Sequence, residues 1–230
     1  YTWDSNTGFA KVNGTNWQHW AWKRHAGFDV VTYKGNGVAG RQIPHNLSKI
    51  PEMIWIKTRN QNYSWIAGHK GLNGGTNPWH YAIHLDRDEA EEDVNNRWND
   101  TAPTSTAFTV GNHNYVNSNG NTFVAMLFAS VEGISKVGSY SGANYNQTIT
   151  LGFQPRFLIV KAATTTSNWS VFDTTRGWVS GNDNYLALNT NAAEVTSNDY
   201  ADPTSTGFTI NITGNAMNGG GETYIYYAHA

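Results

Sequence analysis

The sequence predicts an all-β protein made of tandem or fused antiparallel β-sandwich repeats of the jelly-roll kind, with little helix. Three observations support this prediction. Aromatic residues make up 13% of the 230 residues and charged residues only 14%, so the surface must be polar mainly through Asn, Thr, Ser and Gly. Pairs such as Asn-Gly and Gly-Gly separate short apolar runs, which is typical of strands joined by tight turns. Finally, the second half of the chain repeats the first.

The internal repeat is clearest in a phrase that occurs twice, TAPTSTAFTV at 101–110 and ADPTSTGFTI at 201–210. Two more pairs of segments match at a spacing of about 100 residues: PEMIWIK (51–57) with PRFLIVK (155–161), and NGNTFVAMLFA (119–129) with GGETYIYYAHA (220–230). A unit of this length is too long for a solenoid coil or a propeller blade, but it suits a small β-sandwich.

A third, partial copy precedes the two complete ones, because NTGFAK at 6–11 is similar to STGFTI at 205–210. The aromatic segment WQHWAW at 17–22 then reads as a strand of this truncated copy, docked on the next unit. The sequence therefore predicts three parts, which are the tail end of a preceding repeat (1–25), a first β-sandwich repeat (26–132) and a second β-sandwich repeat (133–230).

Apolar runs within each repeat predict the strands. MIWIK and FLIVK each follow a proline and are nearly continuous, so we expect strands that are buried on both sides or central in a sheet. The segment 79–85 alternates instead, which predicts a half-buried strand with Trp79 on one face and His80 and His84 on the other. The acidic segment 86–98 is the one helical candidate, a short turn over a sheet edge.

The phrase that occurs twice is predicted to be scaffold. Pro103 and Pro203 suit the entry to a strand, where a missing donor has no ladder partner. The Ser and Thr side chains can satisfy nearby backbone groups in the turn, and Phe108 and Phe208 then enter the core.

Metal binding has weak support. His80 and His84 are four residues apart along a predicted strand, too far to share a metal ion without a third ligand from elsewhere. Their counterparts in the second repeat are Asn184 and Leu188. The acidic run 86–93 offers oxygen ligands but lacks the glycine and the spacing of a calcium loop, so we interpret it as a solvated face. We expect no metal and no cofactor.

Catalysis has little support either, and we expect no catalytic residue and no enzyme. A glycosidase needs two carboxylates roughly 5–10 Å apart, but most acidic residues cluster in the run 86–93. Glu52 lies beside a predicted strand, and Arg156 replaces it in the second repeat. The chain has no cysteine, which excludes thiol chemistry, and no G-x-S-x-G motif. Lys57 and Lys161 match across the repeats, and each is expected to cap a loop carbonyl or to form a local salt bridge.

Composition also limits the partners. The formal net charge of -2 gives no basic excess to bind phosphates, so nucleic acid is not expected as a partner. The chain has no run of about 18 apolar residues, so membrane insertion is not expected. The predicted loops combine aromatic rings with Asn, Gln and His, which suits sugar or protein ligands. Our candidate ligand-binding residues are Trp79, Tyr63, Trp178 and Tyr145, and the alternative is that such rings fill the ends of the sandwich.

Several motifs in succession carry a family resemblance: VTYKGNG, IPHNLSKIPEMIWIK, YSWIAGHKGL, WNDTAPTSTAFTV, YIYYAHA and the junction HWAWKRHAGFDVVTYKG at 19–35. Together they resemble a repeated domain of unknown function found in tail-fibre-like proteins of marine bacteriophages. The resemblance covers essentially the whole chain. It implies a virion protein with a lectin-like β-sandwich and a surface role, and it brings no catalytic motif. The acidic run 86–93 and the histidines of 80–84 depart from the pattern.

These observations predict a structural and adhesive component of a phage virion, outside the cell, in a tail fibre or receptor-binding protein. We expect weak contacts to a host surface glycan, multiplied in a homo-oligomer that also contacts other virion proteins. Two alternatives stay open, a capsid decoration or cement protein and a polysaccharide depolymerase.

Overall fold

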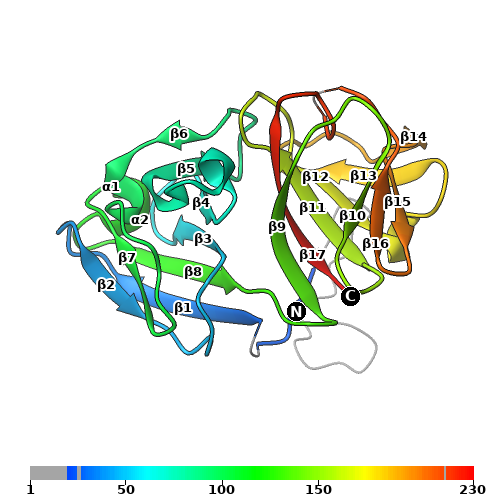
Figure 1. The fold of residues 1–230 in the computed structure, drawn as a ribbon. Helices are drawn as coiled ribbons and strands as arrows, with labels where there is room; N and C mark the ends of the chain where they lie inside the picture. The colour runs from blue at the N-terminus through cyan, green and yellow to red at the C-terminus, as the bar shows by residue number, and fades with distance from the viewer. Residues whose placement is uncertain (1–19, 25–26, 215) are drawn as a thin grey trace.

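The computed structural model describes residues 20–24, 27–214 and 216–230. In this part of the chain the protein is all-β, with antiparallel sheets in two similar sandwich-like units and almost no helix (Figure 1). The predicted fold class is therefore confirmed. No helix among these residues is long and apolar enough to cross a membrane.

The first unit combines a six-stranded sheet with a two-stranded sheet. Its strands are β1 (Phe28–Lys34), β2 (Arg41–Pro44), β3 (Met53–Thr58), β4 (Ile66–His69), β5 (Tyr81–His84), β6 (Glu92–Asp93), β7 (Ala107–Val110) and β8 (Thr122–Phe128). Short helices lie in its connections: η1 (Leu72–Gly75), η2 (Pro78–His80), α1 (Asn95–Trp98) and α2 (Asn114–Asn117). The larger sheet has the order β1-β8-β3-β4-β5-β6, and β2 pairs with β7.

The second unit combines a six-stranded sheet with a three-stranded sheet. Its elements are β9 (Ser135–Ser141), β10 (Gln147–Thr150), β11 (Phe157–Ala162), β12 (Ser170–Asp173), η3 (Thr174–Arg176), β13 (Asp183–Ala187), β14 (Val195–Asn198), β15 (Ala201–Thr204), β16 (Gly207–Ile210) and β17 (Thr223–His229). The larger sheet has the order β14-β13-β12-β11-β17-β9, and the smaller one β10-β16-β15.

The two larger sheets have the same topology. Read from β9, the second sheet runs β9-β17-β11-β12-β13-β14, which matches β1-β8-β3-β4-β5-β6 strand for strand. Register agrees as well, since Met53 pairs with Phe128 and the matching Phe157 pairs with His229. The sequence repeat is thus also a structural repeat. The predicted strand at 17–22 is wrong for residues 20–22, which belong to no strand, and its first part lies outside the described residues.

The central strands are buried on both faces, as the continuous apolar runs predicted. In β3, Ile54 and Ile56 face the core of the first unit, whereas Met53 and Trp55 face a cluster shared by both units. In β11, Leu158 faces the core of the second unit, and its neighbours Phe157 and Ile159 face the shared cluster. The molecule therefore has one core inside each unit and a third between the two larger sheets.

The prediction of a strand over 79–85 is wrong at its start. Asn77 has a left-handed φ of 46° and Pro78 opens η2, so Trp79 and His80 lie in a helical turn. The ring of Trp79 consequently packs in the core of the first unit, whereas Tyr81, Ile83 and Leu85 face the shared cluster. The predicted alternation is therefore correct only from Tyr81 to Leu85, because the proline and the helical turn shift the register before β5.

Most of the acidic segment is not helical, so the predicted helix is correct only at Asn95–Trp98. Its backbone bridges the two units. The N–H of Glu91 donates to the carbonyl of Ala163 at 2.7 Å, and the carbonyl of Asp88 accepts from the N–H of Ser167 at 2.9 Å. An extended chain can make these bonds because its N–H and C=O groups are not used in helical turns.

The repeated phrase is scaffold, as predicted. Phe108 and Phe208 are fully buried in the cores of their units. Pro203 lies in β15, an edge strand, where its missing donor leaves no ladder bond unmade. The hydroxyl of Thr104 accepts from the N–H of Ala107 at 3.1 Å and so holds the turn before the strand.

Candidate functional site

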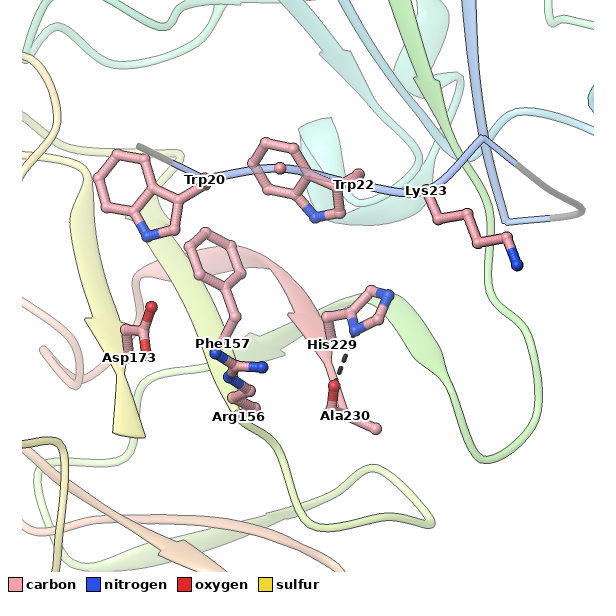
Figure 2. Close-up of a pocket in the computed structure, with 9 residues that line it drawn as sticks. Trp20, Trp22, Lys23, Arg156, Phe157, Asp173, His229 and Ala230 are labelled. Atoms are coloured by element: carbon pink, nitrogen blue, oxygen red, sulfur yellow. Dashed lines mark hydrogen bonds between the residues drawn. The ribbon is translucent and has the colours of Figure 1, made fainter. Parts of the chain in front are cut away.

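The strongest candidate site is a cavity of about 340 Å³ between residues 20–24 and the second unit, which we call the polar cavity (Figure 2). Its wall is both aromatic and charged. The lining residues are Trp20, Ala21, Trp22, Lys23, Arg156, Phe157, Asp173, His229 and Ala230.

A row of side chains on adjacent strands forms one side of the polar cavity. Phe157 of β11 pairs with Asp173 of β12 and with His229 of β17. Paired residues of neighbouring strands point to the same face, and neighbouring strands lie about 4.8 Å apart. A carboxylate and an imidazole therefore flank the ring of Phe157 on opposite sides.

Two tryptophans form the opposite side of the polar cavity. Figure 2 shows Trp20 and Trp22 side by side on the segment that crosses above Phe157. Their ring centroids lie 6.0 Å and 5.6 Å from that of Phe157, at interplanar angles of 67° and 88°. Trp22 also meets Trp55 edge to face at 6.5 Å, which ties the segment to the first unit.

The polar groups of the cavity are only partly committed to protein partners. Asp173 Oδ1 accepts from the N–H of Thr175 at 2.8 Å, where it caps η3. The exposed guanidinium of Arg156 donates from Nη2 to the hydroxyl of Thr175 at 3.0 Å. The Nδ1 atom of His229 lies 2.9 Å from the carbonyl oxygen of Ala230 (Figure 2). The second Asp173 oxygen and the remaining guanidinium N–H groups suit a ligand rich in hydroxyls.

A second cavity of about 290 Å³ is lined by residues of both units and by Trp20 and Trp22, and we call it the tryptophan cavity. It shares Trp20, Trp22 and Phe157 with the polar cavity. The other lining residues are Trp55, Trp65, Leu85, Asp86, Met126, Ile159, Val171 and Leu188. Among these described residues Asp86 is the one charged side chain, and its Oδ2 accepts from the N–H of Trp65 at 3.2 Å.

An open depression of about 450 Å³ on the first unit contains Glu52, the carboxylate that the sequence analysis singled out. Its Oε1 forms a salt bridge with Lys70 at 2.6 Å, and Oε2 accepts from the N–H of Ser130 at 2.6 Å. Burial raises the pKa of Glu52, but the bonds from Lys70 and Ser130 outweigh burial and hold that pKa below its usual range. A paired, ionised carboxylate of this kind is poorly suited to act as a general acid at neutral pH.

The four predicted ligand residues occupy separate surroundings. Trp178 has none of its surface exposed, and its indole donates to the carbonyl of Ala201. Trp79 is 6% exposed and packs edge to face on Trp98, and its small exposed part lines the depression beside Glu52. Neither ring offers a free face to a ligand.

The two tyrosines are more accessible. Tyr63 is half-buried, with its ring centroid 5.7 Å from that of Tyr115, and Tyr145 is 68% exposed between β9 and β10. A ligand role for them stays a prediction. Sequence reasoning missed Trp20, Asp173 and His229, although His229 breaks the repeat where the first copy has Phe128.

Other charged groups mainly support the fold. Lys57 donates to the carbonyl of Tyr63, and Lys161 donates to that of Thr165 at 3.3 Å, which confirms the expected capping of loop carbonyls. Burial lowers the pKa of Lys161 to about 8, although nearby acidic residues oppose this shift. Within the described part of the chain, no group of three or more His, Asp or Glu side chains is arranged to hold a metal ion.

Comparison with protein families identifies one match over residues 1–230, to a family described as a domain of unknown function (DUF7483). Because the match spans the whole chain, the protein belongs to this family. No curated protein and no solved structure matches the chain.

Proposed function

We propose that this member of the DUF7483 family is a glycan-binding component of a phage virion, exposed outside the cell in a tail fibre or receptor-binding protein. The polar cavity supports the binding part of the proposal, because its lining combines aromatic rings with positively and negatively charged groups that can form hydrogen bonds. The virion context rests on the motifs that resemble tail-fibre-like phage proteins.

Sugar recognition needs two kinds of surface in one place. The C–H face of a pyranose ring packs on an aromatic ring, and its hydroxyls need both donors and acceptors. Trp20, which is half-buried, supplies the aromatic surface. Asp173 supplies an acceptor, and Arg156 and Lys23, which line the same cavity, supply donors.

A cavity of this size holds a short stretch of glycan and binds it weakly. A homo-oligomer would present several copies of the cavity to a polymeric ligand, so the avidity can exceed the single-site affinity by roughly two to four orders of magnitude. Symmetric assembly, with contacts to other virion proteins, is therefore part of the proposal.

The test is to incubate the purified chain with envelope polysaccharides from candidate hosts and to measure retention and new reducing ends in the same samples. Retention without new reducing ends supports the proposal. New reducing ends would replace it with the depolymerase alternative. If neither occurs with any polysaccharide, the cement alternative takes its place, and virion proteins become the ligands to screen.

Variants locate the site on the molecule. Trp20→Ala and Asp173→Asn should each weaken retention about tenfold, since each removes a contact of the kind worth about 1–2 kcal/mol. Val179→Ala is the control, because this exposed residue lies outside the lining of the polar cavity, and Tyr145→Ala tests the alternative that the loops bind the glycan. If Tyr145→Ala abolishes retention while Trp20→Ala leaves it unchanged, the site is in the loops. Circular dichroism and thermal unfolding confirm that each variant is folded.

A further inference from the structure

We propose that the tryptophan cavity is a second binding site, and that it takes a small organic cation carrying a methylated ammonium group. This inference does not depend on the glycan proposal, because it concerns a separate cavity and a different ligand chemistry, although the two cavities share Trp20, Trp22 and Phe157.

The shape of the site comes from three parts of the chain. Trp55 on β3 and Trp65 just before β4 come from the first unit, Trp20 and Trp22 from the crossing segment, and Phe157 from the second unit. Trp20, Trp22 and Trp65 are half-buried, so their rings are held in place but remain partly accessible. An arrangement of several aromatic rings around one cavity is the form in which proteins recognise methylated ammonium groups.

Two of the four tryptophans that line the cavity present carbon surface rather than hydrogen-bond donors. The indole nitrogens of Trp20 and Trp55 are buried and have no partner, so these two rings offer no N–H to a ligand in the cavity. A sugar in this cavity would leave most of its hydroxyls without partners, which is costly. A methylated ammonium group needs no such partners, because its charge is spread over apolar methyl groups.

Charge distinguishes a cation from a neutral apolar ligand. Asp86 places a carboxylate on an otherwise uncharged wall, and Asp88, Glu89 and Glu91 follow it in the chain. Two cations lie near this segment, and neither lines the cavity: Arg87 pairs with Glu89 at 3.8 Å, and Lys161 interacts with Asp88, Glu89 and Glu91. Anions are therefore disfavoured, and a cation gains from both the carboxylate and the ring faces.

The site occurs once, although the fold occurs twice. At the matching positions of the second repeat, Ile159 stands in place of Trp55 and Thr190 in place of Asp86. The counterpart of Trp65 is Trp169, which is buried and donates from its indole to the carbonyl of His84 at 2.8 Å. Trp55, the half-buried Trp65 and the carboxylate of Asp86 are thus particular to the first repeat.

The test is a titration of the full chain with choline, followed by tryptophan fluorescence and calorimetry. The control ligand is the neutral analogue of choline in which a carbon atom replaces the ammonium nitrogen, because it has the same shape without the charge. We expect saturable binding of choline and at least about tenfold weaker binding of the neutral analogue. Equal affinities would show an apolar site without selectivity for cations, and no saturable signal would remove the site; either result overturns the proposal.

Variants separate the cavity from general attraction to the acidic segment. Asp86→Asn should reduce the affinity for choline about tenfold and abolish the preference over the neutral analogue. Asp88→Asn is the matched control, since it removes the same charge from the same segment but from a residue that does not line the cavity. Equal losses in the two variants would point to a diffuse electrostatic effect and overturn the proposal. Trp65→Ala should weaken both ligands.

Discussion

In the first unit, the pairs of Met53 with Phe128 and of Met53 with His69 form a row across three strands. All three side chains are at most 1% exposed. The imidazole of His69 lies against the second unit, with Nε2 3.1 Å from the carbonyl oxygen of Tyr226. The contact between the two units therefore covers these three side chains.

In the second unit, the matching row consists of Phe157, His229 and Asp173, and it faces the polar cavity. For the equivalent tryptophans the two units exchange these roles. Trp169 of the second unit is buried in the shared core and donates a hydrogen bond there, whereas Trp65 of the first unit lines a cavity. Two copies of the same sheet can therefore use equivalent positions differently, one to pack against the other unit and one to line a cavity. Where one copy closes the junction, the equivalent positions of the other copy line a cavity.

The cores of the two units are also filled differently, and this predicts the largest effect. Phe172 is fully buried, with ring centroids 5.6 Å from Trp178 and 5.5 Å from Tyr185, whereas the matching position of the first unit is Gly68. Phe172→Ala should lower the free energy of unfolding by about 3–5 kcal/mol, measured by urea denaturation. Val179→Ala, at an exposed position of the same unit, is the control and should change it by less than about 0.5 kcal/mol. An equally small loss for Phe172→Ala would mean that the second core tolerates a cavity.

The buried His69 of this row should make the free energy of unfolding depend on pH. Nδ1 of His69 accepts from the N–H of Gly71 at 2.9 Å, so Nε2 is the protonated nitrogen, and a second proton would disrupt this arrangement. Burial lowers the pKa of His69 to about 4 from the usual 6.5. As the pH falls from 6.5 to 4 the unfolded chain binds a proton that the folded protein does not, so His69 destabilises the fold by an amount of the order of 3 kcal/mol.

The measurement is urea denaturation from pH 4 to 7 for the native chain and for His69→Gln. Asp183 has the opposite effect on stability in this range, because burial raises its pKa to about 6. The difference in the free energy of unfolding between the native chain and His69→Gln therefore isolates the effect of His69. This difference should become smaller as the pH falls. Parallel stability curves would show that His69 is not held neutral by the junction.

The glycine at position 68 should be intolerant of a side chain. A Cβ atom there would lie 2.6 Å from the ring of Trp79 and 2.8 Å from that of Trp98, and both rings are buried. Gly68→Ala should therefore lower the free energy of unfolding by about 1–3 kcal/mol in the same assay. Unchanged stability would mean that the two tryptophans can move apart at little cost.

The smallest expected effect separates the two equivalent tryptophans. Trp169→Phe removes the indole donor to the carbonyl of His84 and should cost about 1–2 kcal/mol, because that buried acceptor loses its partner. Trp65→Phe is the matched change in the other repeat and should have almost no effect on unfolding. Equal losses would indicate that the two positions are equivalent after all.

Sequence patterns were sufficient for the parts of the structure that depend on local periodicity. Continuous apolar runs identified β3 and β11 as strands buried on both faces, and the duplicated phrase identified Phe108 and Phe208 as core residues. Loop aromatics were less reliable. Trp79 and Trp178 look like binding residues in sequence, but a large apolar ring gains more from burial than from exposure. Trp79 is buried from η2, and Trp178 is buried from the loop that follows η3.

By itself, the sequence determined the all-β class, the two copies and the central strands that are buried on both faces. Only the tertiary structure decided which of the two sheet faces would meet, because each repeat has the same pattern and neither records its partner. Contact between the sheets buries His69 and leaves Asp173 beside the polar cavity, although both occupy the same position in the repeat. The physical reason is that long-range packing, not local periodicity, sets whether a side chain at a given position of the repeat is covered by the other unit or lines a cavity.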